Sequence, residues 1–209
     1  MKSKLSFLFL VVIAQQNSSA VIVTADSGGF SQAIVNSANL PIPISEGFIS
    51  VGYFATYNAS TNFGNLSGLD LAADFVSFGS SFQFGGTGFD GFYSSAVNGG
   101  RIDASSSFLG RNVVTLIGNR ATLGASTEAL AYVHSVTFPN DVGSPAPAPI
   151  TTVPGDSGNA GYLFGGPVSG TTTVAGAPIP AIPLARLVPE PSALLLSVLG
   201  LFSLLRRKR

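Results

Sequence analysis

Ser157 and His134 are the two side chains in this sequence that could supply a nucleophile and a general base. Ser157 lies in the segment 154–158, which reads PGDSG, and His134 is the only histidine. A serine nucleophile needs a histidine base and a carboxylate that orients the base. The chain has no cysteine, which excludes disulfides, thiolate zinc sites and cysteine nucleophiles, and one histidine excludes multi-histidine metal sites.

The PGDSG segment resembles the GDSG segment around the nucleophile of chymotrypsin-like serine proteases. In that family the histidine lies far earlier in the chain, next to alanine and cysteine, and His134 has neither that position nor those neighbours. Asp-Ser-Gly is also common in turns. We therefore interpret Ser157 as a turn residue and His134 as a half-buried structural histidine in a strand. We predict no catalytic residue and no enzymatic activity, with a small secreted hydrolase as the weaker alternative.

Four aspartates could supply oxygen ligands to calcium, which takes six to eight of them: Asp70, Asp74, Asp90 and Asp103. Their spacing matches no EF-hand or nonapeptide calcium loop. We expect these carboxylates to cap a helix and to solvate loops, and we predict no metal and no cofactor. A calcium site remains the alternative. A pair of them could also act on a glycoside, but the sequence selects no pair.

Aromatic residues are concentrated in one segment: Phe75, Phe78, Phe82, Phe84, Phe89, Phe92 and Tyr93. Phenylalanine has no polar group with which to orient a sugar, and tryptophan is absent, so we expect core packing. Tyr53, Tyr57 and Tyr162 are better candidates if a glycan is bound. Sequons at Asn58 and Asn65 match the eukaryotic glycosylation pattern, and we interpret both as coincidental.

Charge excludes nucleic acid as a partner. The 209 residues include ten basic and ten acidic side chains, but six of the basic ones lie at the two ends. Residues 21–188 contain nine acids and four arginines, a net charge of −5. Neutralising phosphates requires clustered Lys and Arg.

Hydrophobic residues alternate with a period of two along residues 48–57, 112–117 and 129–138, and more briefly along 21–25 and 81–84. Ser67 and Asp70 have the spacing of a capping box before one short helix. The pattern predicts a mainly β fold: an antiparallel β-sandwich-like domain with one short helix.

Proline divides the interior. Residues 44–138 contain none, whereas 139–191 contain eleven of the thirteen. We therefore predict a β-rich exported domain at 21–138 and a Pro/Gly-rich extension and spacer at 139–187. A last strand is possible at 162–164, and residues 145–149 and 177–191 are expected to be extended and stiff.

The first twenty residues have the pattern of a secretory signal peptide. Lys2 and Lys4 precede an apolar run at 5–14, and small residues follow at 18–20. We predict cleavage by signal peptidase between Ala20 and Val21. Ten apolar residues are too few to span about 30 Å of hydrocarbon.

Residues 188–209 combine a proline-rich triplet, an uncharged segment and a basic end. The triplet is Pro189, Glu190 and Pro191, and residues 192–205 carry no charge. As a helix that segment would be about 21 Å long. The basic tail would stay cytoplasmic, with the bulk of the chain across the membrane: Arg206, Arg207, Lys208 and Arg209.

This arrangement resembles the PEP-CTERM sorting signal of exported proteins from Gram-negative-type bacteria. The resemblance implies a short transmembrane sorting helix, removal of that helix by an exosortase, and delivery to the cell surface or the exopolysaccharide matrix. We expect a structural or interaction role there after transient anchoring in the inner membrane. The alternative is a carbohydrate-binding module for the secreted polysaccharide.

Overall fold

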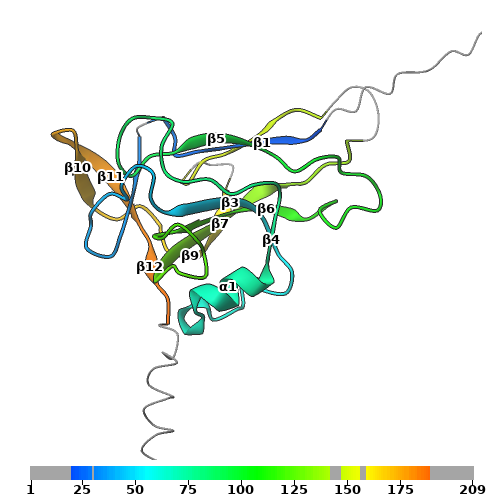
Figure 1. Ribbon diagram of the computed structural model, residues 1–209, viewed down its shortest axis with the longest axis horizontal. Coiled ribbons are helices and arrows are strands. Elements are labelled where there is room, and N and C mark those ends of the chain that lie inside the picture. Colours follow the sequence, from blue (N-terminus) through cyan, green and yellow to red (C-terminus); the bar gives the residue numbers. More distant parts are fainter. Residues whose placement is uncertain (1–19, 30, 142–146, 156–158, 189–209) are drawn as a thin grey trace, which may run out of the picture.

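The computed structural model describes residues 20–29, 31–141, 147–155 and 159–188 (Figure 1). Within these residues the chain forms three β-sheets, the 3-10 helix η1 (Phe63–Asn65) and the α-helix α1 (Gly68–Asp74). The prediction of a mainly β, sandwich-like domain with one short helix is confirmed. No helix in this part of the chain is both long and apolar enough to cross a membrane. The predicted signal peptide up to residue 19 and the sorting segment from residue 189 lie outside the described residues.

The larger sheet is antiparallel and has the strand order β12-β7-β6-β3-β4. A further strand, β9, pairs with β7 at Ala131–His134, next to the site where β12 pairs with Glu128 and Ala129. The strands of this sheet are β3 (Phe48–Phe54), β4 (Phe75–Ser77), β6 (Asn112–Gly118), β7 (Glu128–Thr137), β9 (Asn159–Phe164) and β12 (Ala185–Arg186).

Two smaller sheets have three strands each, in the orders β5-β1-β8 and β10-β11-β2. The pairs β1–β8 and β11–β2 run parallel, which is a departure from the otherwise antiparallel architecture. Parallel strands require a long connection, and both pairs join an early strand to a late one. The strands are β1 (Ile22–Asp26), β2 (Ala33–Val35), β5 (Ser94–Asn98), β8 (Ile150–Thr152), β10 (Thr171–Val174) and β11 (Ala177–Pro183).

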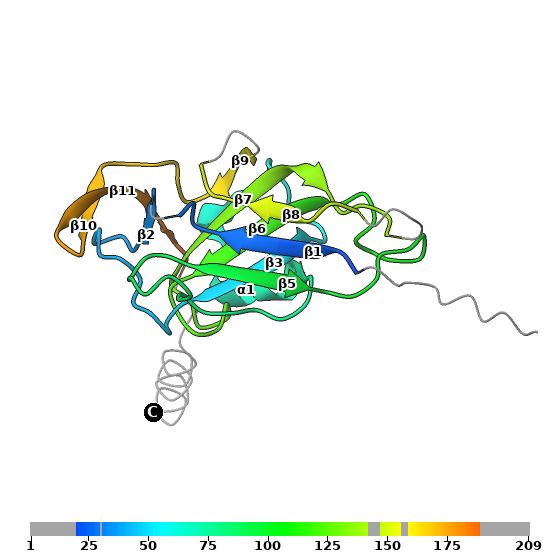
Figure 2. The ribbon, with the colours of Figure 1, turned by 90° about the horizontal axis from the view of Figure 1, so that it is seen from above.

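The β5-β1-β8 sheet lies over one face of the larger sheet, and α1 lies against the other face (Figures 1 and 2). The main core fills the space between the two sheets, with Val23 of β1 and Val51 of β3 among its buried residues. A second cluster covers the outer face, where Leu71 of α1 packs with side chains of the larger sheet. β3 and β6 are therefore buried on both faces, and their alternation does not separate a core face from a solvent face as the sequence pattern suggested.

Helix α1 begins at the predicted capping box. The Ser67 hydroxyl accepts a hydrogen bond from the Asp70 backbone N–H, and the Asp70 carboxylate accepts one from the Ser67 N–H at 2.8 Å. These bonds to Ser67 hold the pKa of Asp70 below its usual value. At the first helical position Gly68 touches the turn that precedes β7, where a Cβ would lie 2.4 Å from the Leu123 carbonyl oxygen. That close approach requires glycine and fixes α1 against the sheet.

The proline-rich part of the chain is integrated into the fold. The spacer predicted at 177–191 is wrong for residues 177–186, which contain β11 and β12. β8, β9, β11 and β12 pair respectively with β1, β7, β2 and β7, which all belong to the part before residue 139. Proline cannot donate a backbone hydrogen bond to a neighbouring strand. It is tolerated in β11 because β2 pairs only with Ala181–Pro183, which leaves the earlier part of β11 without a partner strand on that side among the described residues. The predicted last strand at 162–164 is confirmed as part of β9, whereas 81–84 forms only an isolated bridge from Phe82 to Ile49.

Candidate functional site

A cleft of about 400 Å³ lies on the outer face of the larger sheet. It brings together Tyr53, Tyr57 and Tyr162, the three tyrosines that the sequence marked as candidates for glycan binding. The described residues that line it are Tyr53, Phe54, Tyr57, Asn58, Ala59, Arg111, Asn112, Val114, Val133, Gly161, Tyr162 and Leu163.

Four neighbouring strands form the apolar floor of the cleft. Phe54 ends β3, Val114 lies in β6, Val133 lies in β7 and Leu163 lies in β9. Phe54 and Val114 belong to the outer cluster of the larger sheet, and Val133 and Leu163 pack against it, partly buried. Alternate residues of a strand point to the same face, so this floor is a direct consequence of the strand register.

The wall of the cleft is the loop after β3, which Asp74 holds in place. The Asp74 carboxylate accepts hydrogen bonds from the Thr56 hydroxyl at 2.5 Å, from the Thr56 N–H and from the Tyr57 N–H at 2.9 Å. Burial alone would raise the pKa of Asp74, but these hydrogen bonds lower it. The carboxylate is therefore used to fix the loop that carries Tyr57 and Asn58.

Ring contacts fix the orientation of Tyr57. Its ring lies edge-on to Phe63 with the centroids 6.0 Å apart, and 5.9 Å from the ring of Phe54. Phe63 in turn stacks on Phe164 at 4.7 Å. Burial, followed by the charges of Asp70 and Asp74, raises the pKa of Tyr57. Tyr57 thus remains a neutral hydrogen-bonding group on a preformed aromatic surface.

Arg111 is the only charged side chain among the described residues that line the cleft. Its guanidinium carbon lies 5.2 Å from the centroid of the Tyr53 ring, in a cation–π contact. Its backbone is fixed on both sides, because its N–H donates to the Phe108 carbonyl and its carbonyl accepts from the Phe138 N–H. Asn112, next in the chain, lies where the pairing of β6 and β7 shifts register, and such irregularities re-aim side chains.

Tyr162 contributes to the cleft with its ring. Its hydroxyl is buried and forms no hydrogen bond with any of the described residues. Burial raises the pKa of this phenol. The ring lies 6.3 Å from that of Tyr132 in the main core, so Tyr162 connects the cleft to the core between the sheets.

His134 is a buried structural residue, more enclosed than the half-buried position that the sequence suggested. It is 3% exposed, and its ring lies edge-on to Tyr132 with the centroids 4.9 Å apart. Its predicted partner in the protease alternative, Ser157, lies outside the described residues.

The four candidate calcium ligands each bond to protein groups in separate places. Asp70 and Asp74 cap α1 and hold the loop after β3, as described above, and Asp90 accepts from the Ile44 N–H at 2.9 Å. Asp103 accepts from both the N–H and the hydroxyl of Ser105. Within the described part of the chain no three acidic or histidine side chains group as metal ligands would.

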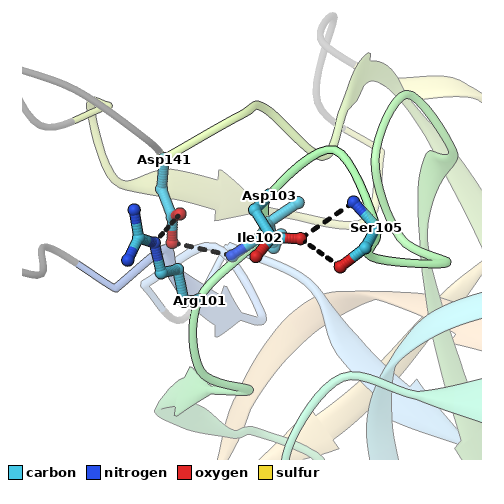
Figure 3. Close-up of polar contacts among 5 residues, drawn as sticks. All are labelled: Arg101, Ile102, Asp103, Ser105 and Asp141. Carbon is cyan, nitrogen blue, oxygen red and sulfur yellow. Dashed lines mark hydrogen bonds and ion pairs between the residues drawn. The ribbon is translucent and has the colours of Figure 1, made fainter.

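Asp141 is a buried carboxylate that the sequence did not single out (Figure 3). Its Oδ2 accepts from the Ile102 N–H at 2.9 Å, and its Oδ1 lies 3.8 Å from Nε of Arg101. Asp103 points away from this pair toward Ser105. Asp141 thus joins the segment after β7 to the loop before β6. The sequence carries no signal for this role except that Asp141 follows a predicted strand.

The aromatic segment packs as expected, with one exception. Phe78, Phe84, Phe92 and Tyr93 are almost completely buried, and Phe82 packs partly buried against them. Phe75 belongs to the outer cluster, whereas Phe89 is 41% exposed. Of the two sequon asparagines, Asn58 lines the cleft. Sequence reasoning missed this role, as it missed Arg111, because both residues acquire it only from neighbours on other strands.

The predicted processing residues lie at the boundaries of the described chain. Val21 is 1% exposed and directly precedes β1, and Ala20 is the first described residue. The sorting triplet (Pro189, Glu190 and Pro191) and the basic tail (Arg206, Arg207, Lys208 and Arg209) lie outside the described residues.

Comparison with known proteins locates one match. No curated protein matches the chain, and no solved structure matches it. A family model, the PEP-CTERM protein-sorting motif, matches residues 187–209. The resemblance that residues 188–209 indicated is therefore confirmed, and the chain carries the C-terminal sorting motif of a PEP-CTERM protein.

Proposed function

We propose that this chain is a non-enzymatic protein of the cell surface or exopolysaccharide matrix that binds secreted polysaccharide through the cleft on its larger sheet. The sorting motif suggests export, transient membrane anchoring at the C-terminal end and processing by an exosortase. The partners that we propose are signal peptidase and exosortase during export, and a glycan afterwards.

One observation carries the binding proposal: the convergence of Tyr53, Tyr57 and Tyr162 on one cleft. Tyrosine combines an apolar ring face with a polar group, which suits a sugar with its apolar C–H face and its ring of hydroxyls. The side-chain amide of Asn112 adds a donor and an acceptor at the same cleft, and that of Asn58 adds a donor, since its oxygen already accepts from Ser60. Because hydrogen bonds and ring contacts hold the wall, the site requires little ordering on binding.

The proposal of no enzymatic activity rests on the burial of His134 and on the chemistry of the cleft. His134 is enclosed next to Tyr132, and the described residues that line the cleft include no carboxylate and no histidine. Ser157→Ala should leave the protein's structure and any activity unchanged. Covalent labelling of Ser157 by a fluorophosphonate probe would overturn this part of the proposal.

The binding proposal is tested by calorimetric titration of the exported protein with polysaccharide from its own host. Tyr57→Ala should weaken binding at least tenfold because it removes the partly exposed ring of the wall. Phe89→Ala is the matched control, since Phe89 is an exposed aromatic residue that does not line the cleft. If the wild-type protein does not bind the polysaccharide, a purely structural role at the surface replaces the binding role.

A further inference from the structure

The cleft differs in charge from the domain around it. Residues 21–188 contain nine acidic residues and four arginines, yet among the described residues the only charged side chain in the lining is Arg111. A low-dielectric cleft strengthens the field of a charge on its wall. A neutral sugar would gain little from that charge, whereas an anionic one would gain an ion pair.

Arg111 is oriented in advance and has no acidic partner in the described residues. Among those residues the one ion pair joins Arg101 to Asp141. Tyr53, on which the guanidinium rests, is itself 7% exposed and lies edge-on to Phe108 at 5.2 Å. A guanidinium that rests against a ring keeps its N–H groups in one plane, in the fork that matches a carboxylate.

Two carboxylates of the described chain, Asp70 and Asp74, act on Tyr57 at the cleft, and both already accept hydrogen bonds from protein groups. Asp74 accepts hydrogen bonds from Thr56 and Tyr57 behind the wall, and Asp70 accepts them from Ser67. Neither residue lines the cleft. The Arg111 guanidinium is therefore available to pair with an anionic group of a ligand.

We infer that the cleft selects an acidic sugar, a uronic acid residue of a polysaccharide, whose carboxylate pairs with the Arg111 guanidinium. This inference rests on the glycan-binding function proposed above. The sugar ring lies against Tyr57 at the wall, and its hydroxyls face the amides of Asn58 and Asn112. The apolar floor accommodates the C–H face of the ring.

The test compares an oligogalacturonate with its methyl ester, which has the same shape without the charge. The exported protein should bind the free acid at least tenfold more tightly than the ester. Arg111→Gln should remove that preference, so that the acid binds no more tightly than the ester. Arg120→Gln is the matched control, because Arg120 is exposed, carries the same charge and lies outside the lining.

The outcomes separate this inference from the proposed function. Equal affinity for acid and ester, or an acid preference that survives Arg111→Gln, would overturn the inference while the glycan-binding function stands. An acid preference that Arg120→Gln removes equally would also overturn it, because the effect would then reflect overall charge. If the protein binds neither these two oligosaccharides nor its host's own polysaccharide, the proposed function fails as well.

Discussion

The backbone N–H of Val188 donates a hydrogen bond to the carbonyl oxygen of Leu66 at 3.0 Å. One residue earlier, the N–H of Leu187 donates to the Thr127 carbonyl, and the Leu187 side chain is buried in the outer cluster. The folded domain therefore continues up to the residue before Pro189. The sorting triplet follows the domain directly, without the extended spacer that the proline-rich sequence suggested.

This attachment predicts that Leu187 contributes to the stability of the domain. Leu187→Ala should lower the free energy of unfolding by about 2–4 kcal/mol, the usual cost of truncating a buried leucine. Val188→Ala is the control and should cost less than about 0.5 kcal/mol, since Val188 is 43% exposed. Urea unfolding of both variants measures the difference. Equal stability of the two variants would mean that residue 187 is outside the cooperative fold.

We expect exosortase to recognise the sorting triplet and to tolerate few substitutions in it. Glu190→Ala should therefore leave the protein in the membrane with the basic tail attached, whereas the wild type loses the tail. Leu196→Val is the control and should be processed normally, because insertion depends on summed hydrophobicity. Cell fractionation locates each form of the protein, and mass spectrometry of its C-terminal peptide shows whether the basic tail is still attached. If wild type and Glu190→Ala keep the tail and distribute alike, exosortase processing is wrong.

The buried hydroxyls of Tyr132 and Tyr162 should differ in what they contribute to the stability of the domain. The Tyr132 and Tyr93 hydroxyls are 2.9 Å apart in the core between the sheets, so Tyr132→Phe should cost about 1–3 kcal/mol by leaving Tyr93 without that partner. Tyr162→Phe removes a buried hydroxyl that has no hydrogen bond in the described residues, and should be neutral or stabilising. Unfolding in urea at pH 7 compares the two. A larger loss from Tyr162→Phe would contradict the assignment.

Tyr132 should also make the domain sensitive to alkali. Burial raises the pKa of Tyr132 from 10.0 to about 12. The unfolded chain therefore releases this proton first, so the contribution to stability is complete below pH 10 and is lost as the pH rises to about 12. The free energy of unfolding of Tyr132→Phe should fall less steeply over that interval than that of the wild type. Parallel curves would show that Tyr132 does not titrate in this way.

The mature chain should begin at Val21. Cleavage after Ala20 leaves β1 complete, since β1 begins at Ile22 and Val21 is buried in the core. Because Val21 is enclosed in the folded domain, we expect cleavage to precede folding. Edman sequencing of the exported protein should give Val-Ile-Val. An intact Met1 on exported material would contradict the prediction.

The features that the sequence predicted correctly depend on residues close together in the chain. The capping box needs only Ser67 and Asp70, and strands such as β6 are visible from their β-branched residues. The sorting motif is likewise a local pattern, matched within residues 187–209. Neighbouring residues determine these features because capping and strand propensity are short-range effects.

Tertiary structure decided which segments share a sheet and where the cleft forms. The prolines of β11 looked like those of a free spacer, but their strand pairs with β2 from the other end of the domain. The sequence gives no signal for Arg111, and only the pairing of β3 with β6 brings its guanidinium onto the ring of Tyr53. Such contacts depend on strand register, which long-range packing fixes. The sequence by itself therefore determined the fold class and the sorting signal, whereas the binding surface arose from the packing of strands distant in the chain.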